Sequence, residues 1–240
     1  LIKEIYTLAR TDNRLLEVEL RALGILSSIS DRVMRMRLLN ELIDRCPDDS
    51  EDTTFVFLKY VAYLNLCSIS SEADAVNYIE KAEQLLPRLV KPELEMALYI
   101  QKAQNLNFVN DETIRRVWVN QILEILQTVN KAGKESSYIE LASALLPQIE
   151  GLQETDSQIL KTCCVNLLYN YKEDKTNCKE ILEYIKCCGI ICITSRSEYE
   201  KLEYANRAFS LLENFPHMCD ALITSLFYIL IPYFQLSPSI

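Results

Sequence analysis

Glycine is scarce in this chain, and its scarcity excludes most sheet architectures. Only four of the 240 residues are glycine. Sheet proteins use glycine in hairpin turns and bulges, and no Asn-Gly or Asp-Gly hairpin signal occurs here. The four glycines also lie too far apart to form the glycine-rich phosphate loop of a nucleotide-binding protein. The composition therefore favours a helical protein without such a loop.

Histidine is nearly absent, which removes most catalytic and zinc-binding constellations. His217 is the only histidine, so Ser-His-Asp catalysis, Cys-His catalysis and histidine-rich zinc sites have no other residue to use. It follows Pro216 between two predicted helices, where we expect an exposed loop histidine. Acidic pairs such as Glu80 with Glu83 are interpreted as solvated helix faces. We expect no enzymatic activity, no cofactor and no metal site.

The chain has fewer basic residues (25 Lys and Arg) than acidic residues (34 Asp and Glu), and its net charge is −9. The excess of acid is uneven, because residues 1–46 sum to +1 and the rest of the chain sums to −10. A body this acidic repels phosphate backbones, so nucleic acid is not expected as the main partner. The arginines Arg32, Arg35, Arg115 and Arg116 are candidates for contacting an acidic protein segment.

Secretory features are also missing. The chain opens LIKEIYTLAR, with early charges and no long apolar run, and it contains no Asn-x-Ser/Thr sequon. Its nine cysteines are an odd number, as expected for free thiols in a reducing compartment. We therefore predict a cytoplasmic or nuclear location. Because no initiator methionine is present, we expect a fragment of a longer protein.

Apolar residues recur at helical spacing nearly throughout. One predicted helix continues past Gly24, and Asp31 stands where the N-cap of the next helix belongs. Pro47 ends that second helix. The whole pattern predicts about ten helices joined by short loops, no strand, and a single helical-repeat domain over residues 1–240. The predicted helix that contains Gly24 has an apolar stripe of Leu16, Leu20, Leu23 and Leu26.

Two segments sixty residues apart are nearly the same. YIEKAEQLLP at 78–87 and YIELASALLP at 138–147 agree at seven of ten positions. Each is an amphipathic helix that ends at a proline. Recurring helical hairpins are typical of solenoids, in which each hairpin needs its neighbours to bury its faces.

One of these segments carries a resemblance to a known family. EADAVNYIEKAEQLLP resembles the second helix of a tetratricopeptide repeat, with Ala75, Ala82 and the closing Pro87 in their places. The preceding FVFLKYVAYLNLCSIS is similar to the first helix, although the early Trp and Gly of the family are missing. The resemblance covers residues 55–87. It implies an all-α fold of antiparallel helical hairpins stacked as a tetratricopeptide-like α-solenoid.

The functional expectation follows from this fold and from the missing catalytic constellations. We expect a non-catalytic protein–protein interaction scaffold or adaptor, as a subunit or segment of a larger intracellular complex. Its partner would be another protein or continuing repeats of the same chain, and no small-molecule substrate is evident. Since fold alone does not fix function, part of this expectation is analogy.

The C-terminal region contains sixteen residues without a charge, at 221–236. A bilayer-spanning helix needs about twenty apolar residues, and Pro232 would kink this one. We expect a core helix, or one whose exposed side meets a further repeat or a partner, and no membrane span. Tyr228 and Phe234 are the candidate contacts on this segment.

Six of the nine cysteines lie between residues 162 and 192. Cys163 and Cys164 take positions in a predicted apolar stripe as leucine would, and so do Cys188 and Cys192 on the next helix. The metal-binding C-x-x-C spacing is missing, and vicinal cysteines on a helix point about 100° apart. We predict core packing for these thiols and also for Trp118. The alternative is a cysteine-dependent metal- or redox-responsive helical protein.

Overall fold

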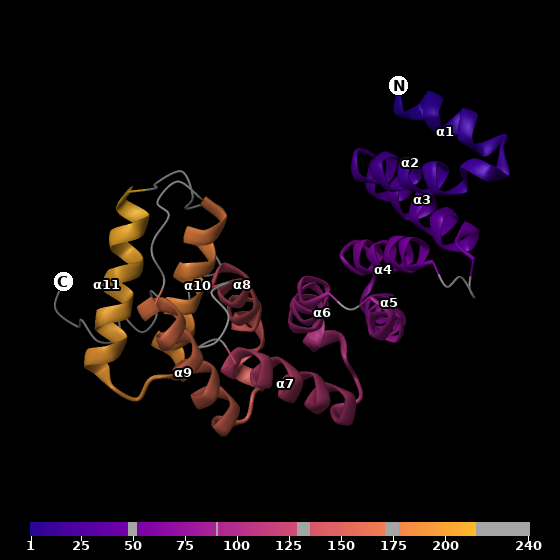
Figure 1. Cartoon of the computed structure of the whole chain (residues 1–240). Coiled ribbons are helices and arrows are strands. Elements are labelled where there is room, and N and C mark those ends of the chain that lie inside the picture. Colours follow the sequence, from indigo (N-terminus) through magenta and orange to yellow (C-terminus); the bar gives the residue numbers. More distant parts are fainter. Residues whose placement is uncertain (48–51, 90, 129–134, 171–177, 215–240) are drawn as a thin grey trace. The chain divides into compact units, whose positions relative to one another are not determined.

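The computed structural model describes residues 1–47, 52–89, 91–128, 135–170 and 178–214 (Figure 1). These ranges contain eleven α-helices, a few short 3₁₀ turns and no strand, which confirms the predicted all-α class. The chain divides into two compact units, an N-terminal unit of Leu1–Glu112 and a C-terminal unit of Thr113–Ile240. The predicted single domain over residues 1–240 stays a prediction.

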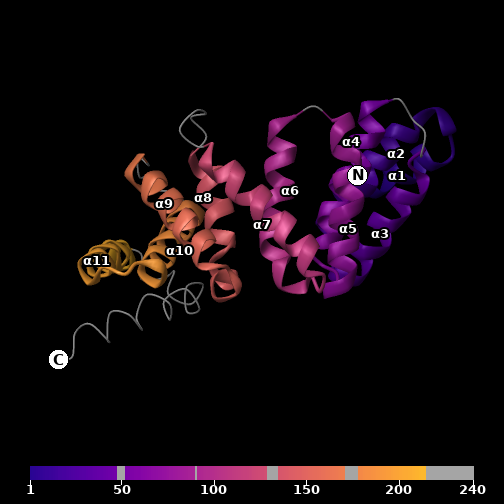
Figure 2. The same cartoon turned by 90° about the horizontal axis from the view of Figure 1, so that it is seen from below.

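In the N-terminal unit each helix packs against the next one along the chain (Figures 1 and 2). Leucines of three consecutive helices form its main core, with Leu23, Leu39 and Leu66 almost inaccessible to solvent. Burying a leucine side chain contributes about 1.5–3 kcal/mol, so this core determines how the helices pack. The helices are α1 (Ile2–Arg10), α2 (Leu16–Ser28), α3 (Arg32–Arg45), α4 (Thr53–Cys67), α5 (Glu72–Leu85) and α6 (Pro92–Asn105).

Local sequence signals explain several helix ends in this unit. The side chain of Asp31 accepts a hydrogen bond from the backbone N–H of Met34 at 2.9 Å, which confirms the predicted N-cap of α3. α2 runs through Gly24 as expected. Proline has no backbone N–H to continue a helix, and α5 ends just before the 3₁₀ turn Leu86–Arg88 that contains Pro87.

The predicted hairpin over residues 55–87 is formed by α4 and α5, which pack closely together. Ala75 and Ala82 on α5 are buried. The rings of Tyr63 and Tyr78 stack with their centroids 6.1 Å apart. Small alanines allow the helices to approach, and the stacked rings add a favourable aromatic contact.

In the C-terminal unit α10 packs against three other helices, α8, α9 and α11 (Figures 1 and 2). α8 also repeats the ending of α5, because both helices lead into a 3₁₀ turn with proline at its second position. This is the structural counterpart of the repeated decapeptide. The helices are α7 (Glu112–Gln127), α8 (Glu135–Ala144), α9 (Glu154–Asn170), α10 (Cys178–Thr194) and α11 (Glu198–Asn214).

Candidate functional site

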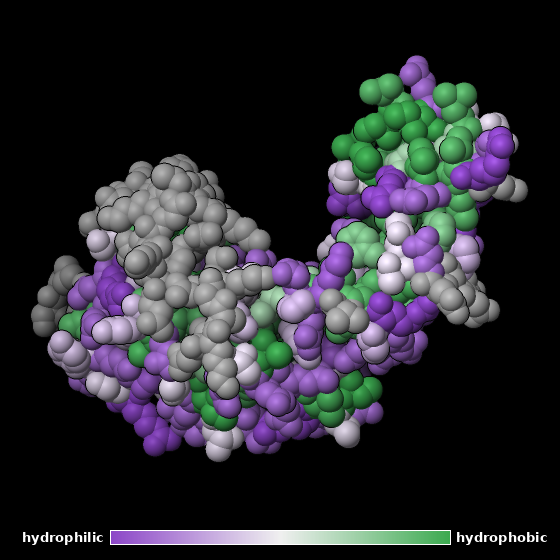
Figure 3. Space-filling view, viewed as in Figure 1, coloured by the Kyte–Doolittle hydropathy of each residue, from purple (hydrophilic) through white to green (hydrophobic). Residues whose placement is uncertain are grey.

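Apolar side chains gather on one face of the N-terminal unit, over α1 and α2 (Figure 3). Leu8 on α1 is 69% exposed, and Ile29 at the end of α2 is 70% exposed. We call this surface the N-terminal apolar face. Soluble proteins rarely expose a large contiguous apolar patch unless it contacts another molecule. The exposed large apolar side chains of α1, of α2 and of the residues at their ends are Leu1, Ile5, Leu8, Leu15, Val18, Ile25 and Ile29.

The face exists because α2 is apolar on two sides. Leu20 and Leu23 are buried toward the core, as the predicted stripe requires, while Val18 and Ile25 form a second, exposed stripe one heptad apart. A helix that is apolar all round is normally buried all round. The predicted apolar stripe does not include this second one, although Leu15, Val18, Ile25 and Ile29 also recur at helical spacing.

The two predicted N-terminal arginines contact backbone carbonyls within the unit. Arg35 Nε donates to the carbonyl of Ser27 at 3.0 Å, and its Nη2 donates to Ser28 at 3.2 Å, so the guanidinium group satisfies the C-terminus of α2. Arg32 Nε donates to the carbonyl of Ile69 at 2.8 Å. A cation at a helix C-terminus is stabilising. These contacts give both arginines a structural role, and their contact with a partner stays a prediction.

The arginines on α7 also have internal neighbours. Arg116 forms a two-pronged ion pair with the buried carboxylate of Asp156 on α9. The guanidinium group of Arg115 lies against Gly151, where it occupies the space that a Cβ atom would need. Trp118 is buried as predicted.

The remaining two predicted contact residues, Tyr228 and Phe234, lie outside the described residues. The same is true of His217 and of the charge-free segment at 221–236. The structure therefore does not test the predictions made for them.

The cysteines pack in the core of each unit. Every cysteine whose side chain is described is buried, including Cys163, Cys164, Cys187, Cys188 and Cys192, which confirms the packing prediction for these five. Cys178 is the first residue of α10, and its side chain lies outside the described part. Buried free cysteine behaves as a small apolar residue.

Burial also makes these thiols poor nucleophiles and poor metal ligands. It raises the pKa of Cys192 to about 12 and the pKa of Cys163 to about 11. The pKa of Cys187 lies well above its ordinary value because of its hydrogen bond with Cys164 and its burial. The thiolate is the form that attacks disulfides and binds metals. The described thiols therefore favour packing over the metal- or redox-responsive alternative.

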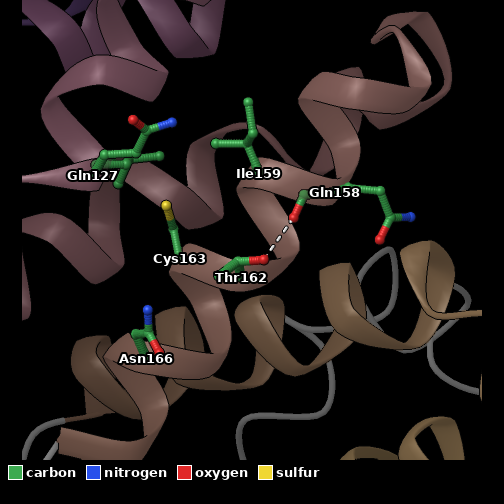
Figure 4. A pocket seen from close by; sticks show the side chains of 7 residues that line it. Gln127, Gln158, Ile159, Thr162, Cys163 and Asn166 are labelled. Atoms are coloured by element: carbon green, nitrogen blue, oxygen red, sulfur yellow. Dashed lines mark hydrogen bonds between the residues drawn. The ribbon is translucent and has the colours of Figure 1, made fainter.

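One small hollow of the C-terminal unit lies between α7 and α9 and has a volume of about 350 Å³ (Figure 4). Leu126 and Ile159 give it an apolar wall, and amide and hydroxyl groups surround its opening. The hydroxyl of Thr162 donates to the carbonyl of Gln158 at 2.9 Å, so it is already used within α9. The thiol of Cys163 is the single titratable group among the described lining residues. The hollow therefore has an apolar wall and uncharged polar groups at its edge.

A polar cluster of the C-terminal unit connects α11 to α9. Lys161 Nζ lies 2.6 Å from Glu200 Oε2, and the hydroxyl of Ser195 donates to the same carboxylate. Burial raises the pKa of Glu200, but the hydrogen bonds from Lys161 and Ser195 outweigh it and lower the pKa below its ordinary value. Ser195 lies in the connection between α10 and α11, and its hydrogen bond to Glu200 has a structural role.

No protein-family model matches the chain, and neither a curated protein nor a solved structure is similar to it. Among the described residues, no helix combines the length and apolar character needed to cross a membrane. In the same part of the chain, no group of three or more His, Cys, Asp or Glu side chains could hold a metal ion.

Proposed function

We propose that the chain is a non-catalytic protein–protein interaction scaffold in the cytoplasm or nucleus, with its helical hairpins stacked as a tetratricopeptide-like α-solenoid. Its partner is another protein of the same complex. The observation that carries this proposal is the N-terminal apolar face, where Leu8 and Ile29 are each about 70% exposed. Removing exposed apolar side chains from water is favourable, so a second surface that covers them gains binding free energy.

The packing of the helices supports the solenoid part of the proposal. In the N-terminal unit each of the helices α1 to α5 contacts the next helix along the chain, as helical hairpin arrays do. The resemblance of residues 55–87 to a tetratricopeptide repeat points the same way, because α4 and α5 pack against each other and Ala75 and Ala82 of α5 are buried.

The test is affinity purification of the full chain from an extract of cells that express it, followed by mass spectrometry. The perturbing variant is Ile25→Ser with Ile29→Ser, which changes the exposed stripe and leaves Leu20 and Leu23 in place. The matched control is Tyr199→Ser, since Tyr199 is 78% exposed on the C-terminal unit. We expect a partner recovered with the wild type and the control to be lost with the double variant. Equal recovery with all three proteins would overturn the assignment of this face.

A further inference from the structure

The exposed apolar side chains of α1 and α2 lie on the sides of these helices that turn away from α3. On α1, Tyr6 donates a hydrogen bond to Glu41 of α3 at 2.8 Å. Leu8 follows two residues later, about 200° round the helix, and is exposed. On α2, Leu23 belongs to the core that α3 shares, whereas Val18, about 140° round the helix, is exposed. The N-terminal apolar face is therefore the side of the α1–α2 pair away from α3.

The exposed stripe of α2 has the spacing of a helix-packing surface. Its members are Leu15, Val18, Ala22, Ile25 and Ile29, of which Ala22 alone is buried. They recur at alternating steps of three and four residues, which is the spacing with which one helix packs along another. At 1.5 Å per residue the stripe is about 21 Å long. This is close to the length of a helix such as α4, which has 15 residues.

The packing of the N-terminal unit shows what kind of element covers such a pair of helices. α2 contacts both of the helices that follow it, α3 and α4, and α4 contacts both α5 and α6. Each of these two helices thus packs on the pair that comes after it, as in an array whose neighbours share one type of contact. α1 and α2 also contact each other. A helix on their outer side would relate to α1 and α2 as α2 relates to α3 and α4.

α4 shows which side chains a helix of this protein uses for such a contact. Ala62 and Leu66 are buried in the core formed with α2 and α3, and Phe55 and Leu58 pack against that core. These four residues recur every three or four positions, so they share one side of α4. A helix with this apolar spacing has the side chains needed to cover the N-terminal apolar face.

Electrostatic attraction has little part in this surface. Residues 1–46 sum to +1, whereas the rest of the chain sums to −10. Charged side chains of α2 and of the turn before it form exposed pairs, Arg21 with Glu17 and Arg14 with Asp12, each at 2.8 Å. Such pairs contribute little and are screened by salt. The partner is therefore recognised by its apolar side chains, and its affinity should change little with salt.

From these observations we propose that the N-terminal apolar face binds an amphipathic α-helix of the partner protein, about sixteen residues long, with apolar side chains every three or four residues. The helix packs on α1 and α2 together. The inference rests on the proposed scaffold function and names the kind of segment that the partner contributes. An extended segment fits less well, because the described part of the N-terminal unit has no strand with which it could pair.

The test is fluorescence anisotropy of the full chain with a labelled peptide of about sixteen residues. Leucines spaced by three and four residues form one side of its helix, and Ala, Glu and Lys form the other. The control peptide has proline in place of one central alanine, so it keeps every leucine but cannot form the helix. The perturbing variant of the protein is Leu8→Ser with Val18→Ser, one change on each helix. The matched control is Tyr199→Ser with Leu202→Ser, since both residues are exposed on α11.

We expect the wild type to bind the amphipathic peptide saturably, with an affinity that changes less than about twofold between about 0.1 M and 0.5 M salt. The variant Leu8→Ser with Val18→Ser should bind it at least about tenfold more weakly. The proline peptide should lose at least as much, and the control variant should stay within about twofold of the wild type. Circular dichroism of both variants establishes that they fold.

Four outcomes would overturn the proposal: no saturable binding, equal binding of the proline peptide, equal weakening by the control variant, or a dimer in sedimentation that Leu8→Ser with Val18→Ser dissociates. The last would assign the face to a second copy of the chain. If the peptide fails while affinity purification still loses a partner with Ile25→Ser and Ile29→Ser, the scaffold function stands and the helical partner segment does not. Failure of the proposed function and failure of this inference are therefore distinguishable.

Discussion

The ion pair between α2 and α3 offers the sharpest test of how the N-terminal unit is held together. Arg45 Nη2 lies 2.7 Å from Glu19 Oε2, and the side chain of Glu19 is 1% exposed. Within the described residues, the other carboxylate oxygen of Glu19 and the Nε of Arg45 have no hydrogen-bond partner. The perturbation is Arg45→Met, which removes the cation and retains most of the side-chain volume.

The magnitude follows from the burial of the two groups. Removing one partner of a buried pair costs about 3–5 kcal/mol, because the other charge is left uncompensated. Arg45 retains 31% exposure, so water already screens part of the pair, and we expect a loss at the low end, about 3 kcal/mol. Adding Glu19→Leu removes the stranded carboxylate. The double variant should therefore return to within about 1 kcal/mol of the wild type.

Urea unfolding of the full chain, followed by far-ultraviolet circular dichroism, measures these differences. The control is Arg21→Met, since Arg21 forms an exposed i,i+4 pair with Glu17 and should change the midpoint little. The reasoning is refuted if Arg45→Met costs no more than the control. It is equally refuted if the double variant is no more stable than Arg45→Met alone.

Three further predictions concern single side chains. Gly24→Ala should raise the free energy of unfolding by about 1 kcal/mol, because alanine has the higher helix propensity. The new Cβ would lie 3.9 Å from Leu42 Cδ1, which is an ordinary contact. A lower melting temperature of the variant would contradict this. Burial raises the pKa of Cys192 from 9.0 to about 12. Above pH 9 the unfolded state therefore binds fewer protons at this thiol than the folded state does. The free energy of unfolding should fall by up to about 1.4 kcal/mol per pH unit from this thiol alone. Urea titrations between pH 8 and 10 in reducing buffer should show a shallower fall for Cys192→Ala, and an unchanged slope would argue against the burial effect. Lys102 is inaccessible, burial lowers its pKa from 10.5, and its Nζ lies 2.5 Å from Glu83, whose side chain is 39% exposed. Because water can solvate Glu83 after the lysine is removed, Lys102→Met should stay within about 1 kcal/mol of the wild type at neutral pH. Because the unfolded state holds the Lys102 proton more tightly, the wild type should gain stability relative to this variant as the pH rises toward 10.5, and a relative loss over that range in the same titrations would show the sign to be wrong.

The helices were predictable because the interactions that form them are local. Apolar spacing and capping residues act within a few positions of one another, so Asp31 marks the start of α3 and Pro87 the end of α5. The cysteines were predictable for the same reason, since Cys163 and Cys164 take stripe positions on a helix whose apolar side is buried. The roles of the arginines were less accessible, because the contacts of Arg35 and Arg116 depend on how the chain packs.

The sequence by itself determined that this protein is helical, where many of its helices begin and end, and which stripe of α2 is buried. Only the tertiary structure decided which remaining surface is exposed and which charges lie together. Val18 and Ile25 are apolar, yet they are 42% and 48% exposed, whereas Ala22 between them on the same side of α2 is buried. Arg21 and Lys91 are far apart in sequence and line one hollow because α2, α4 and the turn after α5 pack together. The physical reason is range: a helix needs contacts three and four residues apart, whereas a binding surface needs elements that the chain brings together only on folding.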